Sequence, residues 1–177
     1  MFKKRTRDWT LVILFGLAAV FLQTTPLHSV LGDKLELNLI FGLIIWLAFY
    51  KRAVDSAILS FLLASAQGAL SGVMSGVYLL AGMSLYLACW MVRDRFAPRS
   101  ASGQFLFALA FAILYKLVLF LALAIFVGTG YFRAQPFSYV LLEILLNAFF
   151  APLIFILFDQ FKGFFDLVPD LVEPRRG

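Results

Sequence analysis

Long apolar runs, separated by short polar segments, make up most of this 177-residue chain. Such runs are typical of transmembrane helices, because crossing a hydrocarbon core about 30 Å thick takes roughly 20 residues. The pattern predicts an all-α integral membrane protein, a single six-helix transmembrane domain with short loops over residues 1–177. The predicted helices cover, approximately, residues 9–23, 35–50, 55–70, 77–92, 104–127 and 139–158, and a tail at 159–177 is predicted to lie in the membrane interface.

The third and fourth predicted helices come from one uncharged stretch, Ser56–Val92. As a single helix this stretch would rise about 55 Å, which exceeds one membrane crossing. Glycines and serines at 71–76 favour a turn over helix continuation. The stretch is therefore predicted to form a helical hairpin.

Basic residues gather at alternate ends of the predicted helices. Of the 15 Lys and Arg residues, only Lys34 and Arg133 fall in loops on the second side, and Lys116 falls inside an apolar run. Because positively charged loops stay on the cytoplasmic side, both termini are predicted to be cytoplasmic. The net charge of +5 is thereby explained by orientation, and nucleic-acid binding is not expected.

The composition limits the chemistry that the chain offers. Hydrophobic residues make up 63% of the chain and charged residues 14%, and there is one His (His28) and one Cys (Cys89). This argues against a disulfide framework and against a metal site. The sequence has no nucleophile–base set, no grouped carboxylates and no phosphate-binding glycine loop. We therefore expect neither enzymatic activity nor a cofactor.

Two ionisable residues, Lys116 and Glu143, lie inside the fifth and sixth predicted helices. A charge at membrane depth costs a few kcal/mol or more unless it is paired or solvated. The rise per residue predicts that the two differ in depth by about 10 Å, so that a contact requires the lysine stem to stretch. An ion pair that fixes helix register and a charge that faces a partner are both open explanations.

The sixth predicted helix carries further polar character. Glu143, Asn147 and Ala151 recur every four residues and share one face, and Asn147 can form a hydrogen bond to another helix. Pro152 cannot donate a hydrogen bond to the carbonyl of Ala148 and is predicted to bend the helix. The bend would either shape packing or open a cavity.

The third predicted helix carries small residues at every fourth position, with Gln67 beside them. Small residues let helix backbones approach closely in lipid. This stripe would pack inside the chain or against a second protein. It consists of Ser56, Ser60, Ala64, Gly68 and Gly72.

Several features occur together in an order that resembles the MreD family of rod-shape-determining membrane proteins. They are Leu22-Gln23-Thr24-Thr25-Pro26, Asn38 before a Leu/Ile-rich helix that runs through Trp46, Ala69-Leu70-Ser71-Gly72 followed by Gly76-Val77, and Asn147 with Pro152. The resemblance covers nearly the whole chain. This chain has Leu37 where many members have Pro, and Gln67 near a position where many have Asp.

The resemblance implies a non-enzymatic membrane scaffold of the bacterial cell-elongation machinery, located in the bacterial inner (cytoplasmic) membrane. Such a protein binds the bitopic protein MreC and supports peptidoglycan synthesis, in one assembly with peptidoglycan synthases and the actin-like MreB filament. The candidate residues for contacting the partner are Lys116, Glu143 and Asn147 in the membrane and the outer loop 26–36. Membrane lipids are expected to surround the helices.

The MreD family is also similar to the substrate-binding subunits of energy-coupling-factor transporters, which have six helices. The alternative is therefore a vitamin-binding subunit of such a transporter. The polar groups available for its pocket are Glu143, Asn147, Tyr131 and Gln135.

Overall fold

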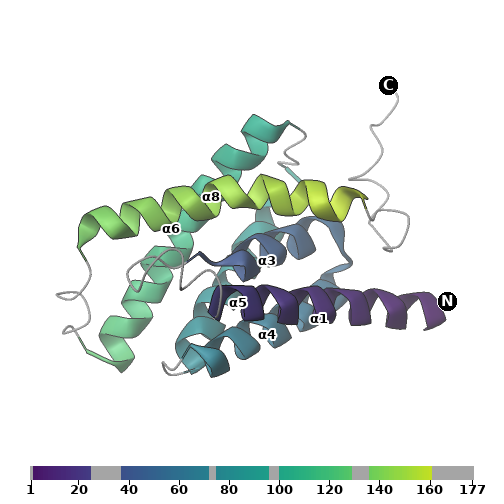
Figure 1. The fold of residues 1–177 in the computed structure, drawn as a ribbon, viewed down its shortest axis with the longest axis horizontal. Coiled ribbons are helices and arrows are strands. Elements are labelled where there is room, and N and C mark those ends of the chain that lie inside the picture. The colour runs from purple at the N-terminus through teal and green to yellow at the C-terminus, as the bar shows by residue number, and fades with distance from the viewer. Residues whose placement is uncertain (1, 25–36, 72–74, 96–99, 129–135, 161–177) are drawn as a thin grey trace.

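The computed structural model describes residues 2–24, 37–71, 75–95, 100–128 and 136–160. Within these ranges all regular structure is helical, which confirms the predicted all-α class (Figure 1). The helices are α1 (Phe2–Thr24), α3 (Leu39–Tyr50), α4 (Ala53–Leu70), α5 (Ser75–Val92), α6 (Ala101–Phe126) and α8 (Phe137–Gln160). The predicted loop 26–36, His28, Tyr131, Gln135 and the tail beyond Gln160 lie outside the described residues.

Three of these helices are long and apolar enough to cross a membrane: α4, α6 and α8. The apolar parts of α1, α3 and α5 are shorter, at Trp9–Leu22, Leu39–Tyr50 and Gly76–Val92. The break predicted at 71–76 is present, since α4 ends at Leu70 and α5 begins at Ser75.

Local capping sets the ends of α6. The Ser100 side chain accepts a hydrogen bond from the Gly103 N–H at 3.1 Å, so the helix begins at Ala101, before the predicted residue 104. At the other end, Gly128 has a φ of 102° and its N–H donates to the Leu123 carbonyl at 3.0 Å. A glycine tolerates this left-handed conformation, which ends the helix.

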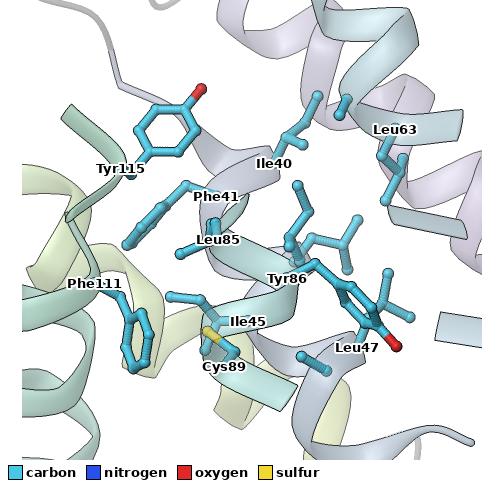
Figure 2. Close-up of a cluster of buried hydrophobic side chains, with 14 of the residues drawn as sticks. Ile40, Phe41, Ile45, Leu47, Leu63, Leu85, Tyr86, Cys89, Phe111 and Tyr115 are labelled. Carbon is cyan, nitrogen blue, oxygen red and sulfur yellow. The ribbon is translucent and has the colours of Figure 1, made fainter. Parts of the chain in front are cut away.

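Helix α3, the shortest of the described helices, lies in the core of the molecule. All ten residues from Ile40 to Phe49 are buried, and α3 packs against α8, α5, α4 and α1 (Figure 1). Figure 2 shows Phe111 and Tyr115 of α6 near Phe41 of α3, and the Phe41 and Tyr115 rings meet edge to face at 5.8 Å. Twelve residues rise only about 18 Å, which is shorter than a hydrocarbon core of about 30 Å.

The outward faces of the longer helices are apolar. On α6, Leu117 is 60% exposed while its neighbour Lys116 is 7% exposed. On α8, Phe149 is 61% exposed while Glu143 is fully buried. This is the reverse of a water-soluble bundle, where apolar surface of this extent is rare. The arrangement fits a hydrocarbon environment, in which lipid chains contact the exposed apolar side chains.

The small-residue stripe of α4 is used inside the chain. Ser56, Ser60, Ala64 and Gly68 are buried, and the Ser56 and Tyr86 hydroxyl oxygens lie 3.0 Å apart across α4 and α5. Next to the stripe, Gly82 of α5 faces Ala64, and a Cβ added at Gly82 would lie 2.7 Å from the Cβ of Ala64. The predicted packing role is therefore the one observed for these four residues, and Gly72 lies outside the described residues.

The close approach of α4 and α5 makes Gly82→Ala a sharp test of this packing. The added methyl has no room beside Ala64, so we expect a loss of about 1–3 kcal/mol, typical of overpacking. The measurement is thermal unfolding in detergent. The matched control is Gly76→Ala in the same helix, where nothing lies within 4 Å of the added Cβ. Equal melting temperatures for the two variants would contradict the packing.

Candidate functional site

Five polar residues from three elements form what we call the polar cluster: Asn38, Tyr115, Lys116, Glu143 and Asn147. Its centre is an ion pair between α6 and α8, in which Lys116 Nζ donates to Glu143 Oε2 at 2.5 Å. The side chain of Lys116 is 8% exposed and that of Glu143 is fully buried. Breaking such a pair is costly because it leaves a charge in apolar surroundings.

The depth difference of about 10 Å predicted between these two residues does not prevent their contact. In the structure Lys116 precedes the end of α6 by ten residues and Glu143 follows the start of α8 by six, which reduces the difference to about 6 Å. In addition, α6 crosses α8 obliquely (Figure 1). The lysine stem spans the remaining distance.

A second link joins α8 to the beginning of α3. The backbone N–H of Asn38 donates to Asn147 Oδ1 at 2.7 Å, so Asn147 forms the cross-helix hydrogen bond that the sequence predicts. The Asn38 side chain reaches α6, with Nδ2 donating to the Tyr115 hydroxyl at 3.0 Å. Its Oδ1 accepts from the Phe41 N–H at 3.0 Å and thereby caps α3. One asparagine thus connects three helices.

The polar face of α8 is the buried face. Glu143, Asn147 and Ala151 are 0%, 6% and 0% exposed, which confirms that they share one face. Helix α8 continues through Pro152, which is half-buried. At this level Gly42 of α3 comes close, since a Cβ added there would lie 3.5 Å from the Ala151 Cα. The residues around Pro152 thus support close packing of α3 on α8, and the predicted bend stays a prediction.

The C-terminal end of α3 is capped by an arginine that lies just after α5. Arg93, just after α5, donates from Nη1 to the carbonyl oxygens of Lys51 at 3.2 Å and Ala48 at 3.5 Å. The last carbonyls of a helix carry partial negative charge, so a guanidinium there is favourable. Both ends of the central helix are therefore held by side chains from its neighbours.

The hydrogen bonds of the polar cluster hold α3, α6 and α8 together. Hydrogen bonds inside the chain engage all five of its side chains. Gln67 is half-buried near the end of α4 and is not part of the cluster. Cys89 is buried in the hydrophobic core. Among the described residues, no group of three or more His, Cys, Asp or Glu side chains could hold a metal ion.

Three contributors were not identified as site residues from the sequence: Asn38, Tyr115 and Arg93. The sequence places Asn38 before the second predicted helix, and an asparagine before an apolar run is a capping signal. Tyr115 adjoins Lys116, and its hydroxyl is a polar handle on a buried ring. Arg93 reads as an orientation charge, and nothing local indicates that its side chain reaches α3.

Comparisons with known protein families, with curated proteins and with solved structures gave no match to this chain.

The ion pair yields a double-variant prediction. Lys116→Leu removes the ammonium from the fully buried Glu143 carboxylate, and we expect a loss of about 3–5 kcal/mol in stability. Replacing both partners by leucine should recover most of that loss, because no buried charge is left behind. Thermal unfolding of the wild type, the two single variants and the double variant measures the coupling. Additive losses in the double variant would show that the two side chains do not act as a pair.

Proposed function

We propose that this chain is a non-enzymatic membrane scaffold of the bacterial cell-elongation machinery, similar to MreD. In this proposal it binds an MreC-like bitopic membrane protein and supports peptidoglycan synthesis beside an actin-like filament. The proposal originates in the order of sequence features that resembles the family.

One structural observation carries the proposal further. Two residues on which the resemblance depends, Asn38 and Asn147, are 109 positions apart and join through the 2.7 Å hydrogen bond between α3 and α8. Two residues that lie far apart in the sequence thus meet in the polar cluster. This supports treating the resemblance as a property of the whole bundle rather than of scattered short motifs.

The proposed topology has six membrane crossings with both termini in the cytoplasm. The beginning of α1 and the end of α8 lie at the same end of the molecule (right in Figure 1), as an even number of crossings requires. Helix α3 supplies about 18 Å of its crossing. Leu37 and Asn38 add to that length before α3 begins.

In this proposal the polar cluster positions the partner-binding surface. Lys116, Glu143 and Asn147 are buried within the chain, so their influence on a partner passes through the placement of α6 and α8. The outward faces of those helices, on the side opposite the cluster, present apolar side chains such as Leu117 and Phe149. A transmembrane segment of an MreC-like protein would pack against surface of this kind.

The second candidate is a vitamin-binding subunit of an energy-coupling-factor transporter. It follows only from the similarity of such subunits to the MreD family. Its pocket needs polar groups that face an open space. In the structure Glu143 accepts from Lys116 and Asn147 accepts from Asn38. The observations therefore favour the scaffold.

Affinity purification in mild detergent from a rod-shaped bacterial host tests the proposal. With the tagged chain as bait, mass spectrometry should identify an MreC-like protein together with peptidoglycan synthases. Recovery of a transporter ATPase and coupling subunit would instead assign the chain to vitamin uptake.

The variants of the ion pair refine this experiment. We expect Lys116→Leu to lower the yield of the MreC-like partner while the chain still inserts into the membrane, and the double variant Lys116→Leu/Glu143→Leu to restore it. An unchanged yield for the single variant would contradict a role for Lys116. A double variant that is stable but recovers no partner would show that the charges contact the partner directly.

A further inference from the structure

Two short connections, 51–52 between α3 and α4 and 93–95 after α5, are held together at one end of the bundle. The contact is the hydrogen bond from Arg93 Nη1 to the Lys51 carbonyl at 3.2 Å. Four basic residues consequently lie on these two connections. Asp94 forms an ion pair with Arg93, and Asp55 lies in the first turn of α4. The four, which we call the basic patch, are Lys51, Arg52, Arg93 and Arg95.

The members of the basic patch differ in what they can reach. Lys51 is 3% exposed. The Arg93 side chain is 15% exposed, and its Nε donates to Asp94 Oδ1 at 3.2 Å. Arg52 and Arg95, by contrast, are exposed. These two guanidinium groups are the ones positioned to contact a ligand from the surroundings.

Large apolar side chains adjoin the exposed arginines along the helices. Val54, two residues after Arg52, is 66% exposed. Trp90 and Met91, in the last turn of α5 before Arg95, are 41% and 74% exposed. A ligand that fits this surface therefore carries an anionic group joined directly to a long apolar part.

We propose that the basic patch binds the headgroup of an anionic phospholipid. Arg52 and Arg95 would contact the phosphate, for which the planar guanidinium is suited because it donates two parallel hydrogen bonds. Val54 and Met91 would lie along the acyl chain, and the Trp90 indole at the headgroup level, where tryptophans gather in membrane proteins. An acidic protein segment would match the charge but leave the apolar side chains uncovered. This inference is independent of the scaffold proposal.

Tryptophan quenching by brominated lipids tests the inference with the full-length chain. The protein is reconstituted into phosphatidylcholine vesicles that contain brominated phosphatidylglycerol or, in parallel, brominated phosphatidylcholine. All versions of the chain carry Trp9→Phe, because Trp9 is only half-buried and would also be quenched. Trp90 lies beside the basic patch, whereas Trp46 is fully buried and contributes a constant background. We expect brominated phosphatidylglycerol to quench the wild type more strongly than brominated phosphatidylcholine does. In Arg52→Gln/Arg95→Gln, the relative affinity for phosphatidylglycerol derived from this difference should fall roughly fivefold for each arginine removed.

The matched control is Lys34→Gln/Arg133→Gln, which removes the same charge from loops predicted on the other side. This control should keep the wild-type preference. Equal quenching of the wild type by both brominated lipids would overturn the inference without any variant being needed. An equal loss in both double variants would also overturn it, since net charge alone would then explain the effect. Binding of a polyglutamate peptide that requires Arg52 and Arg95, without a lipid preference, would assign the patch to an acidic protein segment.

Discussion

The structure depends on satisfying the ends of a helix that is buried along almost its whole length. Helix α3 is buried from Ile40 to Phe49, and the first N–H and last C=O groups of any helix have no partner within it. An unpaired backbone group in apolar surroundings costs several kcal/mol. Asn38 and Asn147 satisfy donors at one end, and Arg93 satisfies acceptors at the other. The contacts of α8 and of the end of α5 with α3 meet this requirement, and Tyr115 of α6 holds the capping Asn38 side chain.

The ion pair between Lys116 and Glu143 adds a further contact between α6 and α8 in the same polar cluster. It lies beside the capping contacts, because Tyr115 precedes Lys116 on α6 and Asn147 follows Glu143 by one turn of α8. Each helix therefore directs two neighbouring polar groups inward while its opposite face carries exposed leucine and phenylalanine. Buried ion pairs add little net stability, but they penalise arrangements in which the charges separate. In a mainly apolar bundle, such a penalty selects one register of α6 against α8.

The sequence predicts the local features well and the long-range contacts poorly. Apolar runs and turn residues locate the six helices and the break at 71–76, because length and glycine content act locally. The spacing of Glu143, Asn147 and Ala151 predicts their common face for the same reason. Partner choice is different: no local pattern indicates that Arg93 reaches α3, or that Tyr115 meets Asn38. The relative depth of Lys116 and Glu143 depends on the angle between their helices, which no local pattern indicates, and α6 crosses α8 obliquely (Figure 1).

Amide hydrogen exchange at the start of α3 tests the central claim most directly. In an isolated helix the N–H groups at these positions exchange rapidly, because no carbonyl accepts from them. Here the Asn38 and Phe41 N–H groups donate to Asn147 and Asn38 side chains. NMR of the chain in lipid nanodiscs should therefore show both amides exchanging as slowly as Ala112 in the middle of α6, with Asn147→Ala accelerating the Asn38 amide. Rapid exchange at Asn38 and Phe41 in the wild type, with Ala112 protected, would contradict a central helix whose end is held by its neighbours.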